Sequence, residues 1–315
     1  MTHPTRMSVV PAVLLAVALG SSPALALNTR SFVASFGSDA STCARTQPCR
    51  TLQVAHDKTV AGGEVNMIDV AGFGTLVITK SLSVVNDGVG SAGVLVPPGV
   101  DGVTVNAGSN DIVNLRGLMI EGAGIGGSGI TILSAKAVTI QRCTIHNLVN
   151  HGIVVLNANP VQVTVSDTYI AGVGLVGVVV QPTGTTTVTA VLNRLEVYNS
   201  GSHGIAPMGN QTFGVSKMTV IDTISAQNGG HGFYVYENSC SSGNSSVLQL
   251  IRVNAHHNAP VGVEADGSCA SLVLTGATLL DYPFPYALSN GATGSTYGDN
   301  AMQGWGDDLT PIARR

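Results

Sequence analysis

A glycine recurs every 23 to 30 residues through the middle of the chain, and a short apolar run follows it each time. The recurring glycines are Gly129, Gly152, Gly177, Gly204, Gly232 and Gly262. Apolar side chains stand one and three places after the glycine, as in Phe233 and Val235. Because neighbouring side chains of a strand point to opposite faces, these positions point inward and the positions between them outward. Repeats of this length predict an all-β solenoid, a parallel β-helix of stacked coils.

A second apolar segment precedes the glycine in each repeat and predicts another strand of the coil. These segments are Val138–Ile145, Val163–Ile170, Ala190–Val197, Met218–Ser225 and Leu248–Ala255. The turns after them carry Asn147, Asn199, Asn228 and Asn258, with Gly172 at the remaining place. Both residue types accept the left-handed backbone conformation, and stacked asparagine side chains hydrogen-bond along the axis of repeat proteins. A third, Thr-rich strand in each coil, such as Thr185–Val188, is the alternative to two.

Charged residues of alternating sign stand ten places before successive repeat glycines. They are Arg142, Asp167, Arg194, Asp222 and Arg252. On stacked coils roughly 5 Å apart, neighbours of opposite charge pair favourably, each exposed pair contributing a few tenths of a kcal/mol, about 0.2–1. The pattern therefore predicts a structural ladder of ion pairs along one edge of the solenoid.

Two segments outside the repeats predict how the solenoid begins and ends. Residues Arg50–Val60 have apolar side chains at helical spacing, and a short helix there would cover the open edge of the first coil. Three strands are expected next, at Glu64–Val70, Gly74–Thr79 and Ser81–Val85. At the other end Asp281–Tyr286 breaks the repeat, and the tail behind it contains Trp305.

The first 26 residues have the features of a secretory signal peptide. Arg6 gives a positive start, Val9–Leu19 an apolar stretch, and Ala24–Ala26 a small-residue cleavage site. An uncleaved N-terminal anchor is the alternative. We therefore expect a signal peptide at 1–26, an N-terminal segment with a capping helix at 27–62, a parallel β-helix at 63–290 and a C-terminal tail at 291–315. The mature protein is expected in the periplasm or outside the cell.

Composition narrows the classes of partner. Only 10% of the 315 residues are charged, and the formal net charge is −4. Since the chain has no basic run, nucleic acid and anionic membrane surfaces are unfavourable partners. No later segment has the apolar length of a membrane span. We expect a monomer with polysaccharide as its partner class.

Five cysteines in an exported chain predict disulfides first. Cys43 and Cys49 are six residues apart and would close a small loop. Cys240 and Cys269 follow the glycines of two neighbouring repeats by eight and seven residues. They occupy nearly the same point of adjacent coils, roughly 5 Å apart, and so predict a second bridge. Cys143 is left over and is expected as a buried thiol.

Several segments resemble a known group of proteins. Gly37–Asp39, Pro48–Ala55 and Ala61–Val65 resemble the opening of exported bacterial β-helix proteins of the pectin-lyase-like superfamily, and the glycine-led coils resemble their repeat region. The resemblance covers residues 31–290 and implies a right-handed parallel β-helix. It does not select an activity, because the superfamily includes lyases, hydrolases, epimerases, phage tailspikes and adhesins.

The motifs of the hydrolytic members are mostly missing. Polygalacturonase-like members have Asn-Thr-Asp, Asp-Asp, Ser/Gly-His-Gly and Arg-Ile-Lys on successive coils, whereas this chain has only Ser202-His203-Gly204. Its Asp307-Asp308 pair lies in the tail, behind the coils. His151 and His231 share the repeat position of His203, so a role at a corner explains this residue without catalysis. His203 is a weak catalytic candidate.

The outward positions two and four after each glycine give the other candidates. From coil to coil they are Val154/Leu156, Val179/Gln181, Ala206/Met208, Tyr234/Tyr236 and Glu264/Asp266. Tyrosine rings stack on sugars and carboxylates accept hydrogen bonds from hydroxyl groups, so Tyr234, Tyr236, Glu237, Glu264 and Asp266 are candidate ligand-binding residues. Pectate-lyase-like members hold Ca²⁺ with acidic side chains and use Arg or Lys as a base. By that resemblance Glu264, Asp266 and Arg252 are weak catalytic candidates, and Ca²⁺ is the one cofactor to consider. Alternatively, the tail or a partner protein covers this strip.

No cluster of histidines has the spacing of a zinc site, so no metal site is expected. The sequence favours an exported binding or structural protein without a recognisable catalytic constellation. The competing hypothesis is a lyase or glycoside hydrolase acting on an acidic polysaccharide, and a third is a purely architectural stalk.

Overall fold

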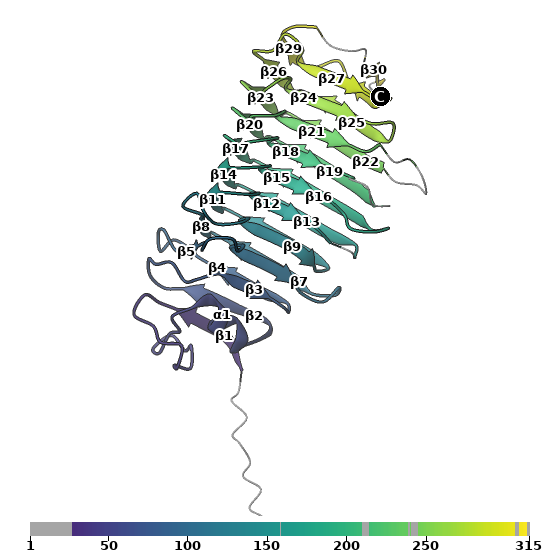
Figure 1. The fold of residues 1–315 in the computed structure, drawn as a ribbon. Coiled ribbons are helices and arrows are strands. Elements are labelled where there is room, and N and C mark those ends of the chain that lie inside the picture. Colours follow the sequence, from purple (N-terminus) through teal and green to yellow (C-terminus); the bar gives the residue numbers. More distant parts are fainter. Residues whose placement is uncertain are drawn as a thin grey trace, which may run out of the picture.

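The computed structural model describes residues 27–157, 159–209, 214–238, 240, 245–305 and 309–313. Its coils stack from the N-terminal to the C-terminal end into one elongated solenoid (Figure 1). Within the described ranges the strands form three sheets, one of 12 strands and two of nine, and neighbouring strands in each are parallel. The predicted all-β parallel solenoid is confirmed, with three strands in a complete coil.

The sheets are named here by the order in which a coil visits them. The first sheet contains β1 (Asn28–Val33), β2 (Thr59–Met67), β4 (Leu82–Val85), β7 (Ile112–Arg116), β10 (Ala137–Gln141), β13 (Val161–Ser166), β16 (Thr187–Asn193), β19 (Val215–Ile221), β22 (Ser245–Ile251), β25 (Ala270–Thr275), β28 (Thr293–Thr296) and β30 (Thr310–Pro311). The second contains β5 (Gly93–Leu95), β8 (Met119–Glu121), β11 (Thr144–Leu148), β14 (Tyr169–Val173), β17 (Glu196–Tyr198), β20 (Ile224–Ala226), β23 (Asn254–His256), β26 (Thr278–Leu280) and β29 (Ala301–Met302). The third contains β3 (Leu76–Ile78), β6 (Val103–Asn106), β9 (Ile130–Ser134), β12 (Ile153–Val155), β15 (Val178–Val180), β18 (Ile205–Pro207), β21 (Phe233–Tyr236), β24 (Val263–Asp266) and β27 (Tyr286–Ser289).

The segments predicted as single strands before each glycine are each two strands. Val138–Ile145, for example, is divided into β10 and β11 by Arg142, whose φ is 53°. The other four residues of the charge ladder also have positive φ, between 49° and 55°. One residue in the left-handed region turns the chain from the first sheet into the second, so the ladder marks a corner rather than the middle of a strand.

Two of the expected ion pairs form along this corner. Arg194 and Arg252 each donate from Nε and Nη2 to a carboxylate one coil earlier, at Asp167 and Asp222. The Nε–Oδ1 distances are 2.6 and 2.7 Å. These pairs are exposed, so their contribution to the free energy of unfolding is small.

The repeat glycines lie where successive coils approach each other closely. A Cβ atom on Gly152 would lie 2.5 Å from the carbonyl oxygen of Gly177, and one on Gly177 would lie 2.5 Å from that of Gly204. Gly204 and Gly232 make the same contact with the next repeat glycine, and Gly262 makes it with the carbonyl oxygen of Pro285. Because a Cβ atom does not fit against backbone at this distance, the period of the glycine follows from the stacking itself.

The core is the column of inward side chains along the axis. On the third sheet the residues one and three places after the glycine are buried in every coil from β12 to β24, as predicted. A short ladder of buried polar groups accompanies them. Asn228 Oδ1 accepts the N–H of Ser200, Asn258 Oδ1 accepts the N–H of Asn228, and Tyr282 Oη accepts the N–H of Asn258. Asn147 and Asn199 instead take positive φ, so the turn asparagines have two different roles.

The N-terminal end has a helix shorter than the predicted one. Helix α1 (Leu52–Asp57) has Thr51 as its N-cap, and β2 begins at Thr59, so the strand takes the last part of the predicted helical segment. At the two ends of the solenoid, β1 pairs with β2 and β28 pairs with β25. No helix in the described part of the chain has the length and apolar character to cross a membrane.

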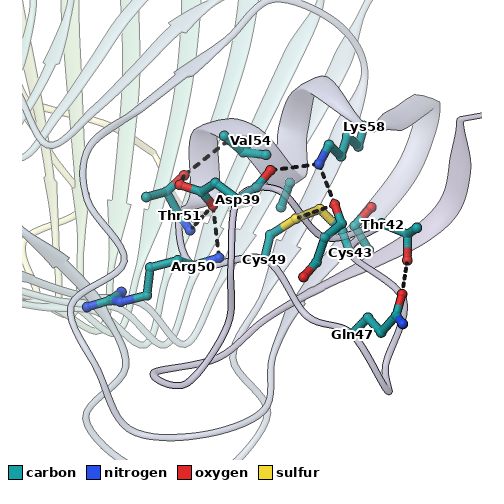
Figure 2. Close-up of a disulfide and its surroundings, with 12 residues drawn as sticks. Asp39, Thr42, Cys43, Gln47, Cys49, Arg50, Thr51, Val54 and Lys58 are labelled. Carbon is teal, nitrogen blue, oxygen red and sulfur yellow. Dashed lines mark hydrogen bonds between the residues drawn. A yellow bond between two sulfur atoms is a disulfide. The ribbon is translucent and has the colours of Figure 1, made fainter. Parts of the chain in front are cut away.

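Both predicted disulfides are present. Cys43–Cys49 closes the N-terminal loop, with Cα atoms 4.6 Å apart, and Figure 2 shows it beside α1. Asp39 holds the same loop by accepting the N–H groups of Arg50 and Thr51 at 2.9 Å. Cys240–Cys269 joins adjacent coils with a Cα separation of 5.5 Å. Cys143 is free and buried, as expected.

Candidate functional site

The outward residues of the third sheet bring most of the candidate residues together. The strand register places Tyr234 beside Glu264 and Tyr236 beside Asp266 on adjacent strands, β21 and β24. Met208 precedes Tyr236 on the coil before, through an isolated bridge. We call the outward side chains of β21 and β24, with Met208, the tyrosine–acid face.

An apolar patch borders this face toward the N-terminal end. Val154, Val179 and Ala206 point outward from three consecutive strands, yet their side chains are 3%, 0% and 0% exposed. They form a small cluster with Val176, separate from the core, and Leu156, Met208 and Tyr234 pack against it. The outer surface of the third sheet therefore passes from a closed apolar patch to aromatic and then to acidic side chains.

Four rings form a stack at the centre of the face. His203 lies 4.3 Å from Tyr234 and 5.0 Å from His231, measured between ring centroids, with planes within 15° of parallel. Tyr236 follows 6.2 Å from Tyr234. The stack is possible because His203 and His231 directly precede the repeat glycines of two neighbouring coils, and both tyrosines lie on β21, which follows His231. His203 covers one face of the Tyr234 ring, so this tyrosine is not an open platform.

His203 is held as a neutral side chain. Its Nδ1 accepts the backbone N–H of His231 at 3.1 Å, which places the ring proton of the neutral form on Nε2. Burial, reinforced by the neighbouring His231, lowers the pKa of His203 to about 4. His151 accepts the N–H of Val176 through Nδ1 in the same way at 3.3 Å. This shared arrangement supports the corner role suggested by the repeat position.

Each carboxylate of the face is bound by two donors. Glu264 receives His231 Nε2 at 2.8 Å and Ser289 Oγ at 2.7 Å. The hydrogen bond from His231 is the main reason why the pKa of Glu264 lies below its usual range. Glu264 is therefore ionised at neutral pH.

Asp266 has an equivalent pair of donors. Tyr234 Oη donates to it at 3.0 Å and Asn290 Nδ2 at 2.6 Å. Burial, with the nearby Asp266, raises the pKa of Tyr234 well above its usual range, so the phenol stays protonated and keeps donating. Ser289 and Asn290 were not among the sequence candidates, because they lie beyond the break at Asp281–Tyr286. The continued pairing of β24 with β27 is what brings them here.

Two candidates lie away from the face. The side chain of Glu237 is 0% exposed and packs over Gly209, where a Cβ atom would meet its carboxylate. Arg252 lies at the corner between the first and second sheets, where it binds Asp222. The structure therefore does not bring Arg252 together with Glu264 and Asp266.

The side chains of the tyrosine–acid face supply hydrogen-bond acceptors and aromatic rings. Among the described residues there is no group of three or more His, Cys, Asp or Glu side chains suited to a metal ion. The face presents two carboxylates, the half-buried side chain of Tyr236 and polar groups of β27.

Comparison with known proteins agrees with this architecture. A pectate lyase, Pel9A, is 12% identical with a TM-score of 0.61, and the match covers 89% of this chain and 80% of that chain. The enzymatically active domain of tailspike protein 2 of bacteriophage CBA120 is also 12% identical, with a TM-score of 0.57 over 80% of this chain. This chain spans only 40% of that tailspike domain. At such identities the likeness shows the fold alone.

Sequence comparison gives the family. No functionally curated protein matches the sequence significantly. The profile described as the right handed beta helix region matches residues 101–279, which is more than half of the chain. Since this match spans the stacked coils described above, the protein belongs to the right-handed β-helix family, as its resemblance to pectin-lyase-like proteins implied.

Proposed function

We propose that this chain is an exported, monomeric polysaccharide-binding protein that binds its ligand on the tyrosine–acid face. One observation carries the proposal: the carboxylates of Glu264 and Asp266 on β24 lie directly beside Tyr234 and Tyr236 on β21. Sugar hydroxyls donate to carboxylates, and aromatic side chains pack against the C–H surfaces of pyranose rings. Because Glu264 and Asp266 are fixed by two donors each, they need no reordering when a ligand arrives.

The charge of the face favours an uncharged polymer. None of the outward residues of β18, β21, β24 and β27 is Lys or Arg, whereas Glu264 and Asp266 are both acidic. A polyuronate would bring further negative charge against these carboxylates and would be repelled. A neutral glucan, xylan or mannan avoids this repulsion.

The lowered pKa and the hydrogen bonds of Glu264 favour binding over catalysis. A general acid of glycoside hydrolysis needs a raised pKa, and an acid–base pair needs room for a water molecule or a sugar oxygen. The pKa of Glu264 is lowered instead, and its two oxygens are bound to His231 and Ser289. Arg252, the base candidate of the lyase alternative, lies at another corner of the solenoid, where it binds Asp222.

The test is retention of the purified mature protein on affinity gels that contain neutral glucan, xylan or mannan, with polygalacturonate and alginate as acidic polymers. Retention on a neutral polymer is expected to fall about two- to tenfold in Tyr236→Ala, as for loss of one aromatic contact. Tyr297→Ala, which changes an exposed tyrosine in the C-terminal part of the chain, is the matched control. New reducing ends or unsaturated uronates in any polymer solution would overturn the binding proposal in favour of an enzyme.

Export is proposed on the signal-peptide pattern and the two disulfides. Residues 1–26 lie outside the described residues, whereas both disulfides lie within them. N-terminal sequencing of the protein from the culture medium and the periplasm tests it, with Leu27 as the expected first residue. We also propose that α1, which packs beside β1, β2 and β3, closes the N-terminal end of the core.

A further inference from the structure

A second aromatic surface lies on the outer face of the second sheet, away from the tyrosine–acid face. An open hollow of about 320 Å³ lies at β14 and β17, lined by Asp167, Thr168, Tyr169, Arg194 and Glu196. It sits next to the corner where the ion-pair ladder runs, so charged groups and an aromatic ring meet in one place.

Tyr169 is more exposed than the tyrosines of the tyrosine–acid face. The side chain of Tyr169 is 40% exposed, and its ring centroid lies 6.0 Å from that of Tyr198 at a tilt of 43°. The two rings are therefore tilted rather than stacked in parallel. The neighbours of Tyr198 in register on the flanking strands are Ala171 and Ala226.

Among the polar groups of the hollow, Asp167 and Arg194 bind each other, whereas Glu196 is exposed. Arg194 donates twice to Asp167, at 2.6 and 2.9 Å, and this pair keeps the pKa of Asp167 below its usual range. The remaining N–H groups of the guanidinium are left for another acceptor. Glu196, in register beside Tyr169, is exposed, and among the described residues no side chain donates to its carboxylate. A ligand that supplies hydroxyl donors would satisfy it.

We propose that this hollow is a second carbohydrate site, which binds one uncharged pyranose unit. The sugar ring packs on Tyr169, its hydroxyl groups donate to Glu196, and a ring or hydroxyl oxygen accepts from Arg194. Asp167 neutralises Arg194, so the carboxylate of Glu196 gives the site a net negative charge. This charge disfavours binding of a uronate. The site rests on contacts of the second sheet and stands independently of the tyrosine–acid face.

The test is calorimetric titration of the full mature protein with xylohexaose, cellohexaose and mannohexaose, with hexagalacturonate as the charged comparator. Tyr169→Ala is expected to weaken binding of the responding neutral oligosaccharide about five- to tenfold at one site, while Tyr169→Phe keeps the ring and the affinity. Tyr297→Ala is a closely matched control, because the side chain of Tyr297 is also 40% exposed. Thermal unfolding of each variant checks that the solenoid is intact.

Three outcomes overturn the proposal, and they separate it from the function proposed above. Unchanged affinity and stoichiometry in Tyr169→Ala, together with weaker oligosaccharide binding in Tyr236→Ala, would contradict the second site and support the tyrosine–acid face. Weaker oligosaccharide binding in Tyr169→Ala but not in Tyr236→Ala would support the second site and contradict binding at the tyrosine–acid face. Tighter binding of hexagalacturonate than of every neutral oligosaccharide contradicts the charge argument. Absence of binding to all four oligosaccharides overturns this site.

Discussion

The Nδ1 atom of His203 accepts the backbone N–H of His231 one coil later, and the two imidazole rings stack with centroids 5.0 Å apart. The contact joins the corner before β18 to the corner before β21, and His203 also stacks on one face of the Tyr234 ring. It requires a neutral His203, because a protonated ring would have no acceptor at Nδ1. The stack is therefore sensitive to acid.

Stability is expected to fall below neutral pH because of His203. Its pKa is about 4 in the folded protein, against an ordinary value of 6.5, so the unfolded chain binds more protons between these values. The contribution of this residue is complete above pH 6.5 and is lost as the pH falls toward 4. Between pH 7.5 and 5 we expect a loss of about 1–2 kcal/mol in the free energy of unfolding.

Urea unfolding of the wild type and of His203→Gln at both pH values measures this contribution. The variant cannot titrate at this position, so its stability should change less with pH by that amount. Glu264 also has a lowered pKa, but its contribution is lost at lower pH, below the window used. Parallel pH dependence in the two proteins would show that His203 is protonated without cost in the fold.

The left-handed corner gives a second prediction. Arg142 has a φ of 53°, and glycines occupy the equivalent corner in two other coils, at Gly117 and Gly276. A β-branched residue is strained in this region. Arg142→Val is therefore expected to be about 1–2 kcal/mol less stable than Arg142→Gly in denaturant unfolding.

The residue before it supplies the control. Gln141 is the last residue of β10, where an extended backbone favours valine over glycine. Gln141→Val should therefore be at least as stable as Gln141→Gly. The same order of stability at both positions would contradict a left-handed corner at Arg142.

Much of the coil architecture was predictable because it repeats. Each repeat glycine from Gly129 to Gly232 lies against the next repeat glycine, and Cys240 and Cys269 follow their glycines at almost the same distance in sequence. The position in the repeat therefore predicted the spatial contact. The third strand was harder to predict. Arginine, which occupies this corner at Arg142, has no preference for positive φ, and the apolar pattern continues on both sides of the corner, so the sequence did not mark the turn.

The candidate site was predictable only where it follows the strand register. Tyr234, Tyr236, Glu264 and Asp266 come together because they hold the same positions after successive glycines. Glu237, one residue beyond β21, is buried against Gly209, and alternation along a strand gives no information about a turn. The donors Ser289 and Asn290 come from a coil whose sequence no longer shows the repeat.

The spacing of the repeat glycines is expected to reflect a steric limit. In Gly177→Ala the new Cβ would lie 2.5 Å from the carbonyl oxygen of Gly204, which belongs to the backbone of the next coil and cannot move alone. We expect a loss of about 1–3 kcal/mol in the free energy of unfolding. Gly72→Ala is the control, since its nearest contact would be an ordinary 3.6 Å from Leu95. Equal stability of the two variants would mean that the coils can separate at this corner.

Cys143 is expected to be chemically inert in the folded protein. Burial raises the pKa of its thiol to about 11, and the side chain is 2% exposed, so it lacks both the thiolate form and access for a reagent. Iodoacetamide at pH 8 should leave the native protein unmodified and add one group when the protein is unfolded without reductant, because the other four cysteines are paired. Intact-mass measurement counts the added groups, and Cys143→Ser should add none in either state. An adduct on the native wild type would show that the corner between β10 and β11 opens on the timescale of the reaction.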